Sequence, residues 1–239
     1  MNESEFKSYN RKVFEENSLN ITDDQLDKFW IYRNMLIEWS EKMNLTAILD
    51  DEGIIVKHFL DCAILLRYVD IKPNASLADV GSGAGFPAVV VKIMRPDIGI
   101  TMIDSLNKRL IFLNELLLRL DLDGKTVHLR GEDAGRKPEF REKFDFATAR
   151  AVAKMAILSE YCIPLLKNGG SFVALKGYDV EEEMDSAKSA VKLLGGEISN
   201  IVGYDLINDG KRSIISIKKI SQTPTKFPRP TAKIAKNPI

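Results

Sequence analysis

Apolar residues recur every three or four positions through the first 70 residues, which is the spacing of one buried helix face. The pattern predicts three helices, around residues 6–14, 29–43 and 51–69. Thr22 and Gln25 resemble a capping box at the start of the second helix, and Asn44 ends that helix. We therefore expect residues 1–70 to form an N-terminal helical extension.

From residue 76 onward, short apolar runs alternate with helical patterns. The runs predict strands at residues 77–80, 100–103, 127–129, 144–148 and 171–175. The segments between and after them predict helices at residues 88–94, 108–120, 154–166 and 180–194. Two last strands, at 198–204 and 213–218, are close enough to form a terminal hairpin. This alternation is typical of a parallel α/β sheet, so we expect a Rossmann-like α/β domain over residues 71–220.

The first predicted strand ends in a turn that contains Gly81, Gly83 and Gly85. Because glycine has no Cβ, backbone N–H groups of this turn can approach a ligand at the start of the following helix. Asp104 ends the next strand, where Rossmann-type sites hold a ribose-binding carboxylate. The turn and the acid predict an adenosine site. A tight turn followed by a solvated aspartate is the alternative.

Phe86 stands where the dinucleotide fingerprint has its last glycine, which favours S-adenosylmethionine (SAM) over NAD. SAM carries a sulfonium and an amino acid, for which a carboxylate such as Asp79 is useful. A short-chain dehydrogenase would need a Tyr-x-x-x-Lys pair downstream, and the only such pair, Tyr68 and Lys72, lies upstream. With the terminal hairpin, these features indicate the sheet of a class I SAM-dependent methyltransferase.

Ligands of such sheets bind at the carboxyl ends of the strands. Gly131 and Glu132 follow the third strand and could line the adenine, although an acid at a helix N-terminus also explains Glu132. Arg150 follows the fourth strand and could position a substrate phosphate or base. Lys176, after the fifth strand, is either a substrate contact or a solvated lysine. His58, on the third helix, is either a substrate contact or a surface residue.

Composition narrows the class of protein. Cys62 and Cys162 are isolated in apolar helical patterns, which favours reduced core thiols, and with only two histidines we expect no metal site. No apolar run approaches the roughly 20 residues that span a bilayer, and the N-terminus lacks a signal-peptide pattern. We therefore expect a cytoplasmic protein that does not bind membranes.

The charge is unevenly distributed, although the 34 bases balance the 34 acids. No acid follows Asp209, and this asymmetry indicates a polyanionic partner for the C-terminal end. Prolines make residues 221–239 look like an extended tail, and its bases could follow a phosphate backbone. These bases are Lys226, Arg229, Lys233 and Lys236. A disordered solubilising tail and a weak internal docking role are the alternatives.

The chemistry around the predicted site disfavours two methyl acceptors. The segment after the fourth strand is Ala-Arg-Ala-Val, whereas enzymes that methylate exocyclic amines have Asp/Asn-Pro-Pro-aromatic there. Cytosine C5 requires a nucleophilic cysteine, and Cys162 lies within a predicted helix. Guanine N7 carries a free lone pair, so its methylation needs positioning and desolvation and no general base. We accordingly assign no catalytic acid or base.

Five motifs occur in an order that resembles the RsmG (GidB) family over most of the chain. They are Asn-Leu-Thr-Ala at 44–47, Lys-His-Phe-Leu-Asp at 57–61, Asp-Val-Gly-Ser-Gly-Ala-Gly-Phe-Pro at 79–87, Asp-Ser with Lys-Arg and Phe-Leu within 104–113, and Thr-Ala-Arg-Ala-Val-Ala at 148–153. The resemblance implies a SAM-dependent enzyme that methylates guanine N7 in 16S ribosomal RNA. It also implies cofactor contacts at Gly81, Phe86, Gly131, Glu132 and Arg150.

The end of the chain also resembles the family's basic tail, but Ala232-Lys233-Ile234 replaces the usual Gly-Thr-Pro. We expect a monomer that acts on 16S ribosomal RNA or the small-subunit particle and does not bind DNA. Two other readings of the residues stay open. One is a SAM-dependent methyltransferase of a small molecule or a protein, and the other is a SAM-binding regulator without activity.

Overall fold

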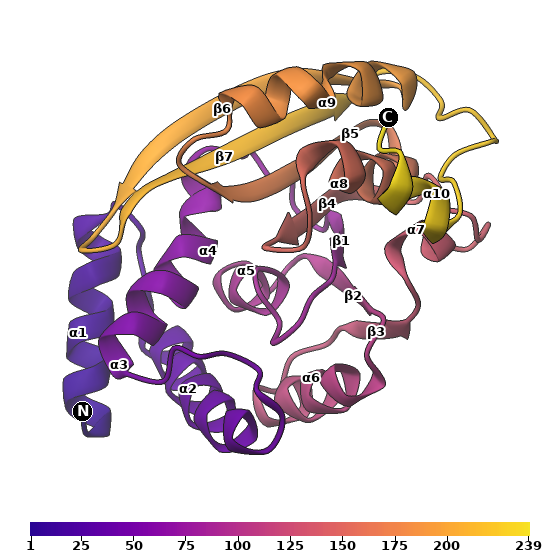
Figure 1. Cartoon of the computed structure of the whole chain (residues 1–239). Coiled ribbons are helices and arrows are strands. Elements are labelled where there is room, and N and C mark those ends of the chain that lie inside the picture. The colour runs from indigo at the N-terminus through magenta and orange to yellow at the C-terminus, as the bar shows by residue number, and fades with distance from the viewer.

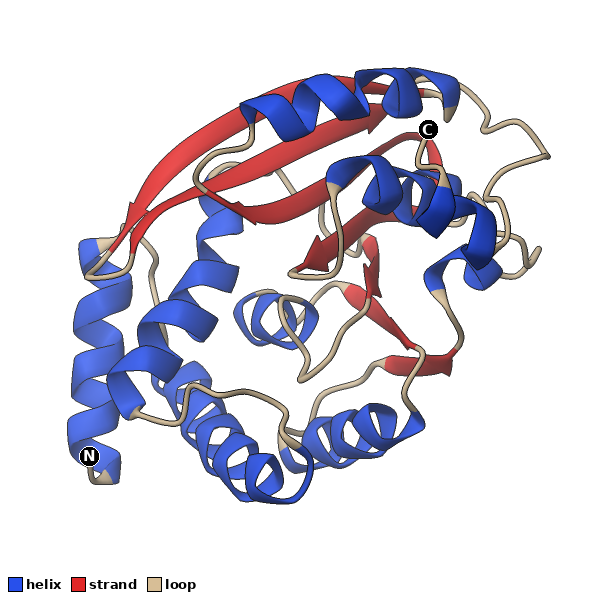
Figure 2. Ribbon diagram, in the orientation of Figure 1, coloured by secondary structure: helices blue, strands red, loops and turns tan.

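The computed structural model describes residues 1–239 as a sheet between two layers of helices (Figures 1 and 2). The strands are β1 (Ser76–Val80), β2 (Gly99–Asp104), β3 (Lys125–His128), β4 (Phe144–Arg150), β5 (Leu166–Gly177), β6 (Gly196–Leu206) and β7 (Gly210–Lys219). Their order in the seven-stranded sheet is β3-β2-β1-β4-β5-β7-β6. Strands β1 to β5 are parallel, and β7 is antiparallel to β5 and β6. The predicted Rossmann-like sheet and its terminal hairpin are confirmed.

The helices divide between the two faces of the sheet, each with its own apolar core. One face carries α1 (Glu3–Glu16), α2 (Asp23–Met43), α3 (Asp51–Gly53), the π-helical η1 (Ile54–Leu60), α4 (Asp61–Ala63), the 3-10 helix η2 (Ile64–Arg67), α5 (Ala88–Met94) and α6 (Asn107–Arg119). The other carries α7 (Gly131–Ala134), α8 (Met155–Cys162), the 3-10 helix η3 (Ile163–Leu165) and α9 (Glu181–Leu193), with α10 (Thr231–Lys236) near the C-terminus. No helix combines the length and apolar character needed to cross a membrane.

The three predicted N-terminal helices are present. Thr22 and Gln25 form the capping box of α2, and Asn44 caps its end in the left-handed conformation. The third helix spans the predicted length but changes geometry, because residues 54–60 form a π-helical segment that carries His58. Single π-helical turns are frequent at functional sites, so this segment is a candidate functional element.

Strand β5 begins earlier than the predicted residue 171 and includes Gly169 and Gly170. The pairing explains the difference. Phe144 lies opposite Leu166 while Phe146 lies opposite Ser171, so extra residues of β5 loop out beside β4. Glycines accommodate such a bulge at little steric cost.

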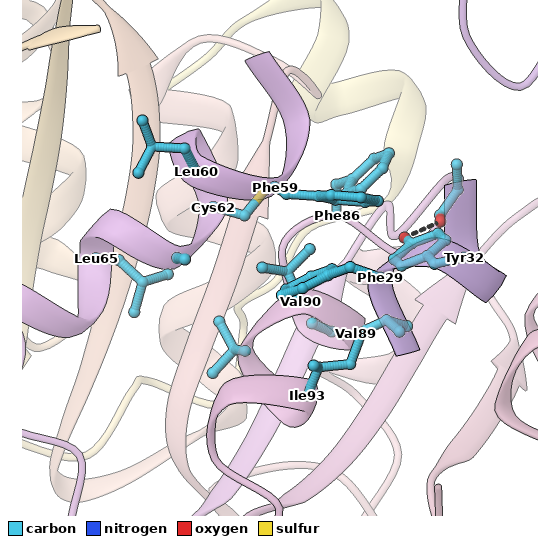
Figure 3. Close-up of a cluster of buried hydrophobic side chains, with 14 of the residues drawn as sticks. Phe29, Tyr32, Phe59, Leu60, Cys62, Leu65, Phe86, Val89, Val90 and Ile93 are labelled. Atoms are coloured by element: carbon cyan, nitrogen blue, oxygen red, sulfur yellow. Dashed lines mark hydrogen bonds between the residues drawn. The ribbon is translucent and has the colours of Figure 1, made fainter. Parts of the chain in front are cut away.

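The N-terminal helices share one core with the sheet. Figure 3 shows Phe29 and Tyr32 of α2 and Phe59 of η1 close to Phe86 and Val90, from the turn after β1 and from α5. All five side chains are buried. The helical extension over residues 1–70 is therefore held to the sheet by continuous apolar packing, which the hydrophobic effect stabilises in proportion to the area removed from water. Both cysteines are buried and unpaired in the two cores, as predicted.

The prediction of an extended tail is wrong, because the tail docks onto the body and residues 231–236 form α10. Phe227 and Ile234 are buried and anchor it. Arg141 donates to the carbonyls of Phe227 and Thr223, each at 2.7 Å. The tail is therefore docked internally, which was one of the alternatives, and its contact with RNA stays a prediction.

The strongest contact of the tail is an ion pair between Arg229 and Glu160 of α8. Arg229 Nη2 lies 2.7 Å from Glu160 Oε2, and Arg229 Nε lies 2.9 Å from Oε1. The backbone N–H of Arg229 also donates to Oε1, at 2.6 Å. The Glu160 side chain is fully buried, and that of Arg229 is 23% exposed. Removing the arginine would leave a buried carboxylate without its cation.

We expect Arg229→Gln to lower the free energy of unfolding by roughly 2–4 kcal/mol, because breaking a buried pair strands one charge. The double variant Glu160→Gln/Arg229→Gln should be more stable than Arg229→Gln alone, since it removes both charges. Lys233→Gln is the control within the same tail, and it should change stability little because Lys233 is exposed. Urea unfolding of the four proteins measures this, and equal stability of Arg229→Gln and the wild type would show that the pair does not hold the tail.

Candidate functional site

The glycine turn after β1 lies where the sheet order changes direction. β2 and β3 extend the sheet to one side of β1, and β4 to the other. In open α/β sheets this switch point opens a crevice at the carboxyl ends of the strands. Gly81 has φ of +72°, and a Cβ there would meet Val152 Cγ2 at 2.6 Å. Gly83 has φ of +58°. The turn therefore needs glycine at Gly81 for space and at both positions for conformation.

A cavity of about 270 Å³ lies beside this turn. Gly81, Asp104, Gly131 and Glu132 all line it, so four of the predicted cofactor residues meet at one place. A Cβ on Gly131 would meet Val80 Cγ1 at 2.7 Å, which explains why glycine stands there. A larger cavity, of about 710 Å³, lies at the opposite ends of the strands. The smaller cavity is the candidate site, because ligands of such sheets bind at the carboxyl ends.

Asp104 is oriented by the backbone around it. Its Oδ2 accepts from the N–H of Gly83 at 2.9 Å, and its Oδ1 accepts from the N–H of Leu106 at 2.9 Å. Arg109 Nη1 lies 3.4 Å from Oδ2. The carboxylate is nearly buried, with 2% exposure. It therefore has a fixed position at the wall of the cavity, and its remaining lone pairs can accept hydroxyl donors.

The donor set of this cavity fits an adenosine group. Two buried carboxylates, Asp104 and Glu132, offer acceptors for ribose hydroxyls and for an amino group. Glycines at Gly81 and Gly131 allow close approach to the backbone, and Val152 and Tyr161 supply apolar surface. The hydroxyl of Thr231 donates to Glu132, so the docked tail contacts one of these carboxylates. The predicted cofactor therefore matches the residues that are present.

Asp79 lies beneath the turn and is fully buried. Its Oδ1 accepts from the Thr148 hydroxyl at 2.7 Å, whereas Oδ2 has no hydrogen-bond partner. Burial disfavours the charged carboxylate and raises the pKa of Asp79 to about 7. In the free protein this carboxyl consequently keeps its proton to near neutral pH, while in the unfolded chain it titrates near its ordinary value.

Because the folded pKa of Asp79 is the higher one, stability from this group is fully present below about pH 4 and is lost as the pH rises to about 7. A shift of this size corresponds to up to roughly 4 kcal/mol. We expect Asp79→Asn, free of cofactor, to be more stable than the wild type at pH 8 and to lose much of that advantage at pH 5. Urea unfolding at both values tests this, with Asp179→Asn, which removes an exposed acid that forms no salt bridge, as the control. A stability difference that does not change with pH would contradict the assignment.

Arg150 lies at the centre of a second group of polar side chains. Its Nη1 donates to Asp61 Oδ2 at 3.0 Å and to the Lys57 carbonyl at 2.9 Å. Its Nη2 donates to His58 Nδ1 at 3.1 Å, and the guanidinium lies 4.8 Å from the centre of the Phe86 ring. Arg150 therefore has a fixed position with most of its donors already used, and it is not among the residues that line the cavity.

His58 is buried and stacks on Phe86 with ring centres 4.5 Å apart, so the surface alternative for His58 is wrong. Burial, reinforced by the positive charge of Arg150, lowers the pKa of His58 to about 3, which keeps the imidazole neutral. His58 Nδ1 faces both the Arg150 donor and the Lys57 carbonyl, which lies 3.2 Å away. On the other side of the ring, Nε2 and the Thr46 hydroxyl share a hydrogen bond of 2.8 Å. The Asn-Leu-Thr-Ala and Lys-His-Phe-Leu-Asp motifs thus meet at one hydrogen bond.

Tyr204 was not predicted from the sequence as part of this group. Its hydroxyl donates to Asp61 Oδ1 at 2.8 Å and extends the chain from Arg150 through Asp61 to the hairpin strand β6. The two residues are 143 positions apart, and no local pattern connects them. Only the position of the hairpin beside α4 could have indicated the contact.

The predicted substrate lysines lie apart from the cavity. Lys176 Nζ pairs with Glu183 at 2.6 Å and donates to the Ala153 carbonyl at 2.8 Å, so its charge is already used. Arg229 is likewise held by Glu160. Lys226 lies 5.2 Å from the centre of the Phe227 ring. Lys233 and Lys236 are exposed on α10, and with Lys226 they are the tail bases that remain open to solvent.

Known structures share this fold at low sequence identity. The chain is similar to a putative methyltransferase from Bacillus halodurans, with 15% identity and a TM-score of 0.53 over 68% of this chain and 100% of the other. It is similar to YcgJ from Bacillus subtilis, with 12% identity and a TM-score of 0.54 over 69% of this chain and 100% of the other. These likenesses confirm the methyltransferase-type fold.

Relatives at higher identity cover nearly the whole chain. A ribosomal RNA small subunit methyltransferase G of Acetivibrio thermocellus is 50% identical over 92% of this chain and 91% of its own length. One of the same name from Oceanobacillus iheyensis is 46% identical over 95% and 96% of the two chains. The model of the GidB family, described as rRNA small subunit methyltransferase G, matches residues 25–214. The chain belongs to this GidB family, as its motifs indicated.

Proposed function

We propose that this protein transfers the methyl group of SAM to N7 of a guanine in 16S ribosomal RNA. The observation that carries the proposal is the position of an adenosine-type cavity, lined by Asp104 and Glu132, at the switch point of a methyltransferase sheet. Relatives at 46–50% identity bear the name of small-subunit ribosomal RNA methyltransferases, which supports the class of substrate. The protein would act in the cytoplasm, on the RNA or on the small-subunit particle.

Each cofactor residue has a role that follows from its place. Asp104 holds the ribose hydroxyls, while Gly131 and Glu132 border the adenine. Gly81 and Gly83 let the backbone approach the cofactor. When bound, SAM supplies a methyl group made electrophilic by the sulfonium.

Phe86 and Arg150 lie at the other end of the turn, toward His58. A His58 whose pKa is lowered to about 3 is a weak base, and Arg150 has most of its donors in use, which suits a reaction that needs no proton removed from the acceptor. Guanine N7 is such an acceptor, because its lone pair is free at neutral pH. These residues would then position the base and exclude water, which raises the rate by fixing the geometry of approach.

The experiment that tests the function uses 16S RNA and small-subunit particles from a strain lacking this gene, incubated with labelled SAM and the purified protein. We expect label to enter the RNA and to map to N7-methylguanosine. Label in a small molecule or a protein, with none in RNA, would support the alternative methyltransferase. Cofactor binding without any transfer would support a regulator.

We expect Asp104→Ala to weaken SAM binding by about 1.5–3 kcal/mol, the range for a hydrogen bond to a charged group. That loss corresponds to roughly 10- to 150-fold in Kd, measured by calorimetry. Glu139→Ala, which removes an exposed acid outside the cavity, is the control and should bind SAM as the wild type does. Unchanged affinity of Asp104→Ala would remove Asp104 from the site.

We expect Arg150→Ala to lose methyl transfer by at least about 100-fold, because the side chain that orders His58 and covers Phe86 is gone. The variant should stay folded, though less stable, since Asp61 keeps the Tyr204 hydroxyl and has Arg212 Nε at 3.9 Å. Single-turnover transfer to RNA and thermal unfolding test this together. Wild-type turnover would make Arg150 purely structural.

A further inference from the structure

A second cavity, of about 510 Å³, adjoins the cofactor site between the end of α2 and the start of α6. Its lining contains Lys42, Lys108, Arg109 and His128 and no aspartate or glutamate. The whole chain has equal numbers of acids and bases, so a cavity lined by bases and no acid is more positively charged than the protein as a whole. Asn44, Ser105, Lys108 and Arg109 of this lining belong to the motifs described above, but the motifs alone did not assign the surface to RNA.

The cations of this surface are available to a ligand. Lys108 is exposed and forms no salt bridge, and Lys42 pairs only with the solvent-exposed Glu38. Surface pairs of this kind contribute little and exchange readily with another anion. Arg130, on the far rim of the cofactor cavity, is also exposed and forms no salt bridge. Asp104 and Glu132, in the cofactor cavity, are each 2% exposed. Glu41 and Glu115 lie near Lys42 but outside the lining, so the lining itself presents positive charge to solvent.

The second cavity is continuous with the proposed active site. Ser105 and Arg109 line both cavities, and Arg109 reaches Asp104. Asn44 lines the second cavity, and two residues later Thr46 bonds to His58. A strand of RNA lying across this surface would therefore touch the loop that contacts the His58–Arg150 group.

The lining also fits an unpaired strand better than a simple anion. Leu106 is 52% exposed beside the cations, and it offers apolar surface to an unstacked base. Asn44 and Asn107 add amide donors and acceptors. Proteins that read single-stranded RNA combine such apolar contacts and amides with cations for the backbone.

We propose that this cationic shelf, made of Lys42, Lys108, Arg109 and Arg130, binds the phosphate backbone of the RNA strand that flanks the methylated guanine. The proposal rests on the proposed function, because it assumes an RNA substrate. It moves the main electrostatic contact from the C-terminal tail to the rim of the cofactor cavity.

The test compares two variants that each remove two positive charges. Lys42→Gln/Lys108→Gln removes two of the four shelf cations without touching the cofactor residues. Lys188→Gln/Lys192→Gln removes two exposed lysines of α9, on the other side of the molecule in Figure 1. Kd for a 16S RNA fragment is measured from 0.05 to 0.5 M salt, and SAM affinity is measured by calorimetry. The single variant Lys108→Gln repeats the test if the double variant misfolds.

Two lost phosphate contacts should flatten the slope of log affinity against log salt by about 1.4–1.8. At 0.1 M salt this raises the RNA Kd about 25- to 60-fold, while SAM affinity stays unchanged. The α9 variant should keep the wild-type slope. An unchanged slope for the shelf variant would overturn the proposal. Wild-type protein that neither binds nor methylates RNA would instead overturn the proposed function, so the two failures are distinct.

Discussion

The site depends on the contact between Phe86 and the N-terminal helices. The Phe86 ring stacks between Tyr32 and His58, with ring centres 5.3 and 4.5 Å away, and the Tyr32 hydroxyl donates to the Ala84 carbonyl at 2.5 Å. Figure 3 shows Tyr32 and Phe86 of this group near Val89 and Val90 of α5. A turn with several glycines has much conformational entropy to lose and few side chains with which to hold itself. The helices of the first 70 residues supply that packing. They hold the turn in position, although none of their residues lines the cavity.

Buried polar side chains extend the same constraint into the sheet. Asp79 bonds to Thr148 across the β1–β4 pair, and Asp61 holds Arg150 and Tyr204. Each of these groups is costly to bury alone and acceptable only with its partners. The network therefore fixes the position of Arg150 from the helical layer and from the hairpin at once. Residues far from any ligand in this way determine the geometry in which a base would meet the methyl donor.

The elements that could be predicted are those with a local signal. Helical stripes, apolar runs, the Thr22 capping box and the glycine turn each act over a few residues, and the structure confirms them. The position of Asp104 beside the turn could be predicted because its distance from the turn is set by one βαβ unit. The docked tail could not be found in this way, since Glu160 and Arg229 are 69 residues apart and their attraction exists only after folding.

The distribution of charge shows most clearly what a sequence leaves undetermined. The sequence favoured the tail as the contact for a polyanion, because no acid follows Asp209. Folding decides which of these bases stay free to bind an anion. Arg229 of the tail is paired with Glu160. Lys108 and Arg130 form no salt bridge, although acids lie near them in the sequence. What a polyanion meets is the set of cations left without carboxylate partners, and its range is limited to about a Debye length, roughly 8 Å in physiological salt. Cations at the rim of the cofactor cavity border the proposed site, so we infer that they orient a strand, whereas the exposed lysines on α10 add affinity but less orientation.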